Sequence, residues 1–375
     1  MIPFNKPFLT GNECSYIEQA VRSGKISGDG LFTKKCHEFF EGKFGFKKCL
    51  LTTSCTDALE MSALLINVQP GDEIIMPSFT FVSTANAFIL RGAKIVFADS
   101  KNDHPNIDED LVEELVTPRT KAIVVVHYAG IACDMETIMD VAKRYGLYVI
   151  EDAAQAIDSY YIFPNGTKRA LGTIGHLAAF SFHETKNVIS GEGGMLAIND
   201  EQFITRAEII REKGTNRSAF FRGEVNKYGW VDIGSSFLPS EIIAAFLWAQ
   251  LENLERIQEK RKAIWEYYWE KLSSLAKPEF ALPKIPPCAT NNAHMFFIVF
   301  NNLEQRTAAM ERCKRNNILA VFHYLSLHKS KFYEKCHDGR RLPNADRFSD
   351  TLLRLPFFYE MKRGEQDLVV SALVA

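Results

Sequence analysis

Short apolar runs alternate with amphipathic stretches between about residue 48 and residue 200. Each apolar run ends abruptly in polar residues, whereas the stretches between the runs have apolar positions at helical spacing. Strands and helices that alternate in this way form a mainly parallel sheet covered by helices. The expected strands are 49–52, 73–76, 94–98, 122–127, 147–150, 177–182 and 195–198, and the expected helices are 56–66, 80–90, 108–116 and 134–145.

The pattern changes after residue 200. A helix is expected over 201–213, and the run 240–275 has no proline or glycine, so a long helix is expected there, with Ser240 and Glu241 placed to cap its start. Beyond the proline-rich stretch 278–287, which we interpret as a linker, we expect a strand near 294–300, a helix near 303–316, a strand near 318–324 and terminal helices. These patterns predict a large domain over 1–250 and a smaller one over 251–375.

Composition narrows the class of protein. Hydrophobic residues make up 46% of the 375 residues and charged residues 24%, as in ordinary globular proteins. The formal net charge of −2 argues against a nucleic-acid partner, and charges interrupt every apolar run well before membrane-spanning length. The N-terminus lacks a signal-peptide pattern, and the eight cysteines form no C-x-x-C pair. We therefore expect a cytoplasmic protein with reduced thiols and no metal site.

Two strand ends carry the most informative residues. Asp152 follows the apolar run 147–150, and Lys186 follows the run 177–182. Ligand sites on open α/β sheets lie beyond the carboxyl ends of the strands, so both side chains are expected at one edge. A carboxylate that keeps a pyridine nitrogen protonated and a lysine that forms an imine are what pyridoxal phosphate needs from a protein. Each residue alone is more often a loop or surface group, and only the combination favours this chemistry.

A phosphate site is expected at the start of the helix 56–66. Ser54, Cys55 and Thr56 lie between a strand and a helix, where free N–H groups and the helix dipole attract anions. Ser181 is placed to add a hydroxyl. The alternative interpretation is an ordinary helix cap, which is the commoner meaning of such a segment on its own.

Three further residues are expected near the pyridine ring. Phe81 stands at a strand-to-helix turn and is placed to stack on the ring, although most of the 28 phenylalanines must be core residues. Gln155 is three residues beyond Asp152 and is placed to bond the ring hydroxyl. His127 ends the strand 122–127, where a contact with the ring and a buried, hydrogen-bonded structural role are about equally expected.

These motifs resemble those of the DegT/DnrJ/EryC1/StrS family of sugar aminotransferases, and the likeness extends over nearly the whole chain. The resemblance implies a fold-type I aminotransferase, with a large domain built on a mainly parallel seven-stranded sheet and a smaller C-terminal α/β domain. The segments that carry it are Asp152-Ala153-Ala154-Gln155, Ser181-Phe182-His183, Lys186-Asn187, Glu192-Gly193-Gly194, Gly71-Asp72-Glu73 and His323-Tyr324.

The resemblance also assigns roles to these residues. Lys186 would bind pyridoxal 5′-phosphate covalently, and Asp152 would hold the pyridine nitrogen. Ser54, Cys55, Thr56 and Ser181 would bind the phosphate, Phe81 would stack, and Gln155 would meet the ring hydroxyl. Relatives often have glycine at the position of Cys55, and many have an asparagine that reaches the partner subunit's phosphate from a segment corresponding to 234–238. Ser236 stands in that segment here.

The implied substrates are a nucleotide-linked 4-keto-6-deoxy sugar and L-glutamate, and the implied assembly is a homodimer. His323, Tyr324, His328 and Arg217 are the residues expected near the substrate, although a structural or solvated position is at least as expected for each. Three other functions remain open from the residues. A pyridoxamine-dependent sugar dehydratase has histidine at the position of Lys186, and an NAD-dependent oxidoreductase needs a G-x-G-x-x-G turn that does not follow the first strand. A non-catalytic relative would have no reason to keep Asp152, Gln155 and Lys186 together.

Overall fold

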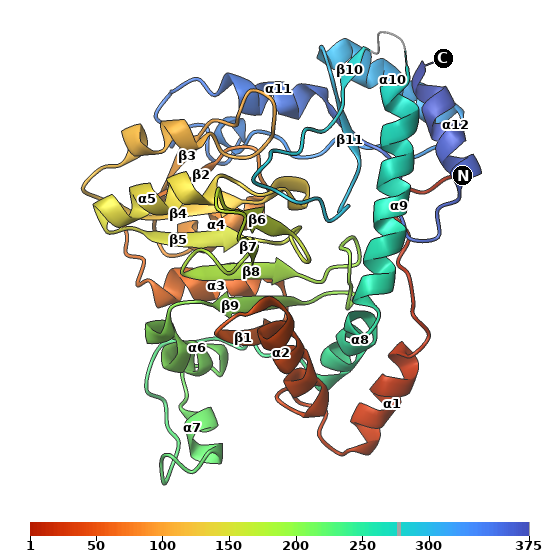
Figure 1. Ribbon diagram of the computed structural model, residues 1–375. Coiled ribbons are helices and arrows are strands. Elements are labelled where there is room, and N and C mark those ends of the chain that lie inside the picture. Colours follow the sequence, from red (N-terminus) through yellow and green to blue (C-terminus); the bar gives the residue numbers. More distant parts are fainter. Residues whose placement is uncertain (276–278, 375) are drawn as a thin grey trace.

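A seven-stranded sheet forms the centre of the protein in the computed structural model, which describes residues 1–275 and 279–374. The strand order is β1-β9-β8-β5-β4-β2-β3 (Figure 1). All seven expected strands are confirmed. They could be predicted because each is an apolar run that ends in polar residues. Their bounds are Lys48–Thr52 (β1), Glu73–Pro77 (β2), Lys94–Ala98 (β3), Thr120–Val126 (β4), Tyr148–Asp152 (β5), Leu177–Ser181 (β8) and Gly194–Ile198 (β9).

Strand direction decides which residues meet at the functional edge. β9 runs antiparallel to both of its neighbours, β1 and β8, and the other neighbouring strands pair in parallel. The carboxyl ends of six strands therefore share one edge with the beginning of β9. In the register, Gly194 is the partner of both Thr52 and Ser181, and Val126 is the partner of Asp152. Residues distant in the sequence are thus brought into one row.

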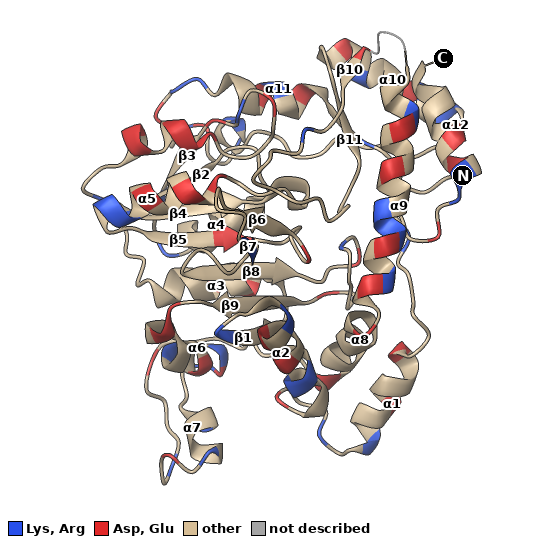
Figure 2. Ribbon diagram, viewed as in Figure 1, with Lys and Arg blue, Asp and Glu red and all other residues tan. Residues whose placement is uncertain are grey.

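Helices pack around this sheet, with α3 against β8 and β9 and α5 against β4 and β5. Charged residues gather on the helices and loops, whereas the strands are mostly uncharged, and the end of β5 stands out in Figure 2. The helices are Glu13–Arg22 (α1), Leu31–Phe44 (α2), Cys55–Leu65 (α3), Val82–Ile89 (α4), Met135–Tyr145 (α5), Ile204–Arg211 (α6), Arg217–Phe221 (α7), Glu241–Leu251 (α8), Leu254–Ser273 (α9), Leu303–Arg315 (α10), Pro343–Thr351 (α11) and Arg363–Val374 (α12).

A second, three-stranded sheet of β10 (Phe280–Ala281), β11 (Phe297–Phe300) and β12 (Leu352–Arg354) lies in the C-terminal part. It has a separate buried cluster that includes Tyr268 and Phe296. Helix α9 contributes Ile257 to the cluster of the large sheet and Ile264 to the second cluster, so it connects the two. The domain boundary after residue 250 stays a prediction, and Pro278, the first residue of the expected linker, lies outside the described residues.

Three expected elements differ from the structure. The segment 108–116 forms two short 3₁₀ turns, Glu109–Leu111 and Glu113–Leu115, instead of an α-helix. The run 240–275 is two helices. They separate at Asn253, whose side-chain amide donates to the carbonyl of Ala249 (2.9 Å) and competes with the helical bonds. Residues 318–324 form only isolated bridges, Ile318 with Ile2 and Val321 with Arg354.

Glu241 has a different role from the expected helix cap. Ser240 occupies the N-cap position of α8 without a side-chain capping bond. The Glu241 side chain, which is only 1% exposed, instead accepts hydrogen bonds from the N–H groups of Gly30 (2.9 Å), Phe32 (2.8 Å) and Thr33 (3.1 Å). Because these groups belong to the start of α2, the carboxylate caps that helix from a distant part of the chain.

The change Glu241→Ala should lower the free energy of unfolding by about 3 kcal/mol, because three buried N–H groups would lose their acceptor. Urea denaturation of the variant and the wild type would measure the difference. Glu255→Ala is the matched control, since that glutamate has an 83% exposed side chain and pairs with Lys43 at 3.0 Å. Its effect should stay within about 0.5 kcal/mol, and an equal loss in the two variants would contradict the proposed cap.

Candidate active site

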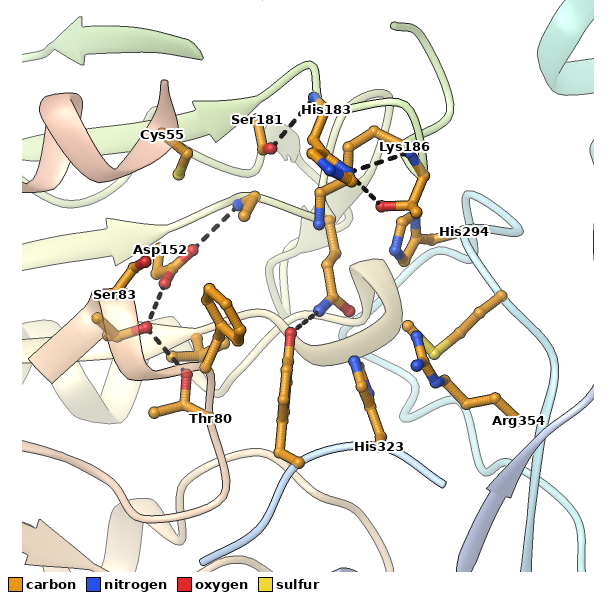
Figure 3. A pocket seen from close by; sticks show the side chains of 18 of the residues that line it. Cys55, Thr80, Ser83, Asp152, Ser181, His183, Lys186, His294, His323 and Arg354 are labelled. Carbon is orange, nitrogen blue, oxygen red and sulfur yellow. Dashed lines mark hydrogen bonds between the residues drawn. The ribbon is translucent and has the colours of Figure 1, made fainter. Parts of the chain in front are cut away.

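A cavity of about 790 Å³ opens at the carboxyl edge of the large sheet. Its volume lies in the range of small-molecule sites. Residues from the ends of β5 and β8, the starts of α3 and α4, and the C-terminal part of the chain form its walls. Figure 3 shows Asp152 and Arg354 on opposite sides of the cavity, with Lys186 between them at its upper edge.

The start of α3 has the geometry of an anion site. Ser54 is the N-cap in an extended conformation, and its side chain accepts a hydrogen bond from the N–H of Asp57 (3.1 Å). The following N–H groups, those of Cys55 and Thr56, belong to the first turn, where a helix has no internal acceptors for them. The Thr56 hydroxyl donates to Ser83 (2.9 Å), and Ser181 lines the same cavity. This cluster suits a phosphate group.

Gly194 allows β9 to approach this anion site closely. A Cβ atom at this position would lie 2.2 Å from the carbonyl carbon of Ser54 and 2.4 Å from the nitrogen of Cys55. Any side chain would therefore push the start of α3 away. The glycine in the Glu192-Gly193-Gly194 motif is needed for close packing of two backbones.

Gly194→Ala should weaken the binding of pyridoxal phosphate at least about tenfold, since the loss of one N–H contact to phosphate is worth about that factor. Equilibrium dialysis of the apoprotein against the cofactor would measure the dissociation constant. Gly42→Ala in α2 is the control, because a Cβ there meets nothing within 4 Å. Unchanged cofactor affinity in Gly194→Ala would exclude this contact.

Asp152 ends β5 and is 6% exposed. Its carboxylate accepts hydrogen bonds from the hydroxyl of Thr84 (2.7 Å) and the N–H of Ala154 (3.2 Å). Burial raises the pKa of Asp152, and these two bonds and the charge of Lys186 offset that effect only in part. A buried carboxylate of this kind is stabilised by a cation placed beside it, such as a protonated pyridine nitrogen.

Lys186 lies in the turn between β8 and β9, and its side chain lines the cavity. Burial lowers the pKa of its amine, and the charge of Arg354 adds to this, while Cys55 and Asp152 act in the opposite direction. A lowered pKa increases the fraction of neutral amine, which is the form that attacks a carbonyl carbon.

The ring platform consists of Phe81, Gln155 and Tyr324. Phe81 is the N-cap residue of α4 and leaves 55% of its surface exposed toward the cavity side. The Gln155 amide donates to the Tyr324 hydroxyl (2.9 Å) and accepts from the N–H of Ala129 (2.6 Å), so its orientation is fixed at both ends. The Tyr324 ring lies 6.0 Å from that of Phe81.

His127 has the structural role that was the alternative to ring contact. It is fully buried, and its Nε2 lies 2.9 Å from Glu151. Glu151 also accepts from the N–H groups of Gly172 (2.6 Å), Ile174 (2.8 Å) and Gly175 (2.6 Å). Burial alone would raise the pKa of Glu151, but the bonds from His127 and the backbone outweigh it and hold the pKa below its usual value.

The expected substrate residues separate into two groups. His323 and Tyr324 line the cavity, and their rings stack at 3.6 Å, with His323 Nδ1 2.6 Å from the Tyr128 hydroxyl. His328 is buried outside the cavity lining, where its Nδ1 lies 2.7 Å from the Ser78 hydroxyl. Arg217, on α7, lies 3.9 Å from Glu212 and also stands away from the cavity.

Ser236 is exposed and forms a backbone bridge with Glu212. It does not line this chain's own cavity. The polar residues of the cavity lining that sequence reasoning missed include Thr84, His294 and Arg354. Of these, only Thr84 could have been found from the sequence. It lies four residues after Thr80, in the first turn of α4, and that turn follows the end of a predicted strand.

Pyridoxal phosphate fits the residues that are present. The anion site at α3, the buried acid that needs a cation, the amine and the aromatic ring at the cavity surround one space, and Gly194 keeps the phosphate end open to the backbone N–H groups. Together with the mixed, mostly parallel seven-stranded sheet, these features define a fold-type I pyridoxal-phosphate-dependent aminotransferase.

Comparison with known proteins agrees with this class. The model of the DegT/DnrJ/EryC1/StrS aminotransferase family matches residues 8–374, so the chain belongs to that family of aminotransferases. An uncharacterized protein of Methanocaldococcus jannaschii is 32% identical over 99% of this chain and 96% of its own. The aminotransferase TlmJ of Streptoalloteichus hindustanus has a TM-score of 0.90 at 28% identity, covering 100% of this chain and 98% of that one.

A further similar structure is PseC of Helicobacter pylori, an aminotransferase involved in the biosynthesis of pseudoaminic acid. It has a TM-score of 0.89 at 25% identity, and the match covers 100% of this chain and 98% of PseC. Within residues 1–275 and 279–374, no helix is long and apolar enough to cross a membrane. In the same described ranges, no group of three or more His, Cys, Asp or Glu side chains is placed to hold a metal ion.

Proposed function

We propose that this enzyme transfers an amino group from L-glutamate to C4 of dTDP-4-dehydro-6-deoxy-D-glucose and forms dTDP-4-amino-4,6-dideoxy-D-galactose. The observation that carries the aminotransferase chemistry is the presence of the Lys186 amine and the Asp152 carboxylate in one cavity. The choice of sugar rests on the resemblance of the chain's motifs to dTDP-4-amino-4,6-dideoxygalactose transaminase. That reaction belongs to cytoplasmic synthesis of a surface polysaccharide, as in enterobacterial common antigen.

Bound pyridoxal phosphate supplies a carbonyl carbon and an electron-withdrawing ring. Asp152 holds a proton on the ring nitrogen through its charge, and Thr84 orients the carboxylate for this contact. The Gln155 amide would hydrogen-bond the hydroxyl of the pyridine ring and so orient the ring. Phe81 would cover one face of the same ring. The N–H groups of Cys55 and Thr56, with Ser54 and Ser181, hold the phosphate.

Lys186 has two tasks in this proposal. Its Nζ would hold the cofactor, and the same amine, when free, would take the proton from Cα of the amino donor. The lowered pKa of Lys186 suits this task because the amine must be neutral to accept a proton. The same amine would return that proton, and it would carry a proton in the opposite direction when the keto sugar is the bound substrate.

We also propose that two copies of the chain complete each other's sites. Three expected site residues stand outside this chain's own cavity, and of these Ser236 and Arg217 are exposed whereas His328 is buried. In a homodimer, their place would be at the partner's cavity, Ser236 at the phosphate and Arg217 near the substrate. His323 and Tyr324 would contact the sugar within one subunit.

The deciding experiment incubates the enzyme with L-glutamate and a panel of dTDP- and UDP-linked 3-keto and 4-keto sugars. NMR of the products would give the position and stereochemistry of the new amine. Product from the dTDP-linked 4-keto sugar, with the galacto configuration, is the expected result. Amination at C3, preference for a UDP-linked sugar, or loss of a sugar hydroxyl in place of amination would each overturn the specific reaction.

A further inference from the structure

His294 is a polar residue of the cavity wall to which the proposed reaction gives no role. It precedes β11 in the chain, and its side chain lines the cavity near Lys186 (Figure 3). Its backbone is held on both sides. The N–H of His294 donates to the side-chain oxygen of Asn292 (3.0 Å), and the carbonyl of His294 accepts from the Arg261 guanidinium (2.6 Å). The imidazole therefore has a fixed place in the wall.

The side-chain amide of Asn187 determines which ring nitrogen of His294 carries the hydrogen. Asn187 Nδ2 lies 2.9 Å from the backbone carbonyl oxygen of Asn292. A carbonyl oxygen can only accept, so the atom that faces it must be the NH2 group of the amide. The amide oxygen of Asn187 then faces His294 Nδ1 at 2.7 Å, and this oxygen also can only accept. His294 Nδ1 therefore carries a hydrogen and donates it to Asn187.

The neighbouring Gln258 on α9 agrees with this orientation. Its Nε2 lies 3.2 Å from the Asp158 carboxylate and 3.2 Å from the carbonyl of Asn292, and both of these groups are acceptors. The Gln258 oxygen therefore faces Asn187, whose Nδ2 donates to it at 2.8 Å. Reversal of any amide in this network would place two acceptors or two donors against each other.

The other ring nitrogen of His294 is an acceptor that the protein leaves free. The side chain is only 7% exposed, and burial lowers the pKa of His294 well below the usual value, with the charge of Lys186 lowering it further. The imidazole is therefore neutral at pH 7 and has one hydrogen, which is on Nδ1. Nε2 forms no hydrogen bond within residues 1–275 and 279–374, and it is accessible from the cavity that His294 lines.

The ligand group that meets Nε2 must be a hydrogen-bond donor. The cofactor phosphate, the carboxylates of L-glutamate and the carbonyl oxygen of a keto sugar are all acceptors at pH 7. The amino group of L-glutamate is a donor, but it is the group that reacts. A hydroxyl of the sugar is the donor that remains.

We propose that His294 Nε2 accepts a hydrogen bond from the sugar hydroxyl on the carbon next to the reacting carbonyl, which is the C3 hydroxyl of a 4-keto sugar. This inference rests on the proposed function and adds a residue that recognises the sugar. His294 bonds to Asn187, the residue that follows Lys186, so the imidazole lies beside the loop that carries the reacting amine. This position favours the nearest hydroxyl over one farther round the sugar ring.

Two variants separate the free acceptor from the bond to Asn187. In His294→Asn, the amide nitrogen takes the place of Nδ1 and can keep the bond to Asn187, but no atom stands at the place of Nε2. In His294→Gln, the amide carbonyl can reach the place of Nε2, but the bond to Asn187 is lost. His337→Asn is the matched control, because His337 Nε2 lies 2.9 Å from the carbonyl of Arg340 and the residue does not line the cavity.

The two half-reactions, followed by the absorbance of the bound cofactor, show which substrate His294 recognises. In His294→Asn, the concentration of keto sugar that gives half the maximal rate should rise about tenfold, the loss expected for one buried hydrogen bond. The L-glutamate half-reaction should be unchanged. His294→Gln should recover part of the loss with the sugar, and His337→Asn should behave as the wild type in both half-reactions.

A ligand without the hydroxyl tests the contact itself. The probe dTDP-6-deoxy-D-galactose has no carbonyl at C4 and cannot react, so isothermal titration calorimetry gives its dissociation constant directly. The wild type should bind this probe about tenfold more tightly than its 3-deoxy counterpart. His294→Asn should bind the two probes alike, because the two changes remove the same hydrogen bond.

Each outcome decides between named alternatives. Equal affinity of the wild type for the two probes would overturn the proposal, as would an equal loss on removal of the hydroxyl in the wild type and in His294→Asn. Defects of His294→Asn in both half-reactions, with a lowered unfolding temperature, would make His294 a structural residue only. If the wild type aminates none of the keto sugars, the proposed function fails, whereas the binding comparison still decides whether His294 contacts the hydroxyl.

Discussion

Replacement of Lys186 by alanine should lower turnover at least about 1,000-fold. Lys186 is the amine at the cavity that can both attach the cofactor and carry the proton from Cα, so one change removes two functions. The variant should also lose the absorbance band near roughly 410 nm that marks an imine of this cofactor with lysine. Borohydride treatment followed by peptide mass spectrometry should locate the cofactor on the Lys186 peptide in the wild type and nowhere in the variant.

The control for this experiment is Lys143→Ala, which removes an exposed lysine from α5. It should keep both the band and the turnover. Thermal unfolding of the Lys186→Ala apoprotein should occur at the wild-type temperature or above, because burial of the amine is relieved. Wild-type turnover in Lys186→Ala, or an adduct on another lysine, would refute the assignment of the catalytic amine.

Replacement of Asp152 by asparagine should lower turnover at least about a hundredfold. Asparagine has nearly the same shape and can still accept the bond from Thr84, so the change removes the charge and little else. Without that charge the ring nitrogen loses its proton and the ring withdraws electrons less strongly. Single-turnover rates with L-glutamate would measure the loss, and an unchanged rate would remove Asp152 from the site.

The direction in which Asp152→Asn changes the stability of the apoprotein follows from the raised pKa of Asp152. In the folded apoprotein the acid holds its proton more tightly than in the unfolded chain, so its ionisation destabilises the fold. This penalty is absent below the usual carboxyl pKa and is complete once the pH exceeds the raised value. Apo Asp152→Asn should therefore be at least as stable as the apo wild type at pH 7 to 8, and this advantage should disappear in acid.

Cofactor binding should make the wild type more stable than Asp152→Asn, the reverse of the order in the apoproteins. The reason is that the protonated ring nitrogen is the partner that the buried carboxylate lacks. Pyridoxal phosphate should raise the unfolding temperature of the wild type more than that of Asp152→Asn. Asp140→Asn on the exposed face of α5, where the acid pairs with Arg144 at 3.0 Å, should respond to the cofactor as the wild type does. An equal cofactor effect in all three proteins would show that Asp152 does not contact the bound ring.

Much of the large sheet could be predicted because local pattern and position agree. The seven strands are short apolar runs that end in polar residues, and parallel pairing puts the ends of β5 and β8 at one edge. That rule is enough to bring Asp152 and Lys186 together without any knowledge of side-chain contacts. The segment 108–116 shows the limit of local pattern, since its helical spacing of apolar residues predicted an α-helix and the structure has two short 3₁₀ turns there.

The cavity wall opposite Asp152 could not be predicted from strand ends and parallel pairing. Arg354 and His294 come from the C-terminal part of the chain, and only the packing of that part against the large sheet turns them toward Lys186. His328 shows the same limit in the opposite sense, because it lies only five residues after His323 in the sequence, yet its side chain bonds to Ser78 and does not line the cavity. Glu241 looks like the start of its own helix and instead serves α2, more than 200 residues earlier in the chain.

Glu151 and Asp152 are adjacent, yet the strand pleat turns them to opposite faces of the sheet. Glu151 holds three backbone N–H groups and His127 inside the protein, whereas Asp152 faces the cavity. Substitutions at Glu151 should therefore lower the yield of folded protein, whereas substitutions at Asp152 should change the reaction. A library randomised at residue 152 would explore new chemistries on an intact scaffold, which the same library at residue 151 would destroy.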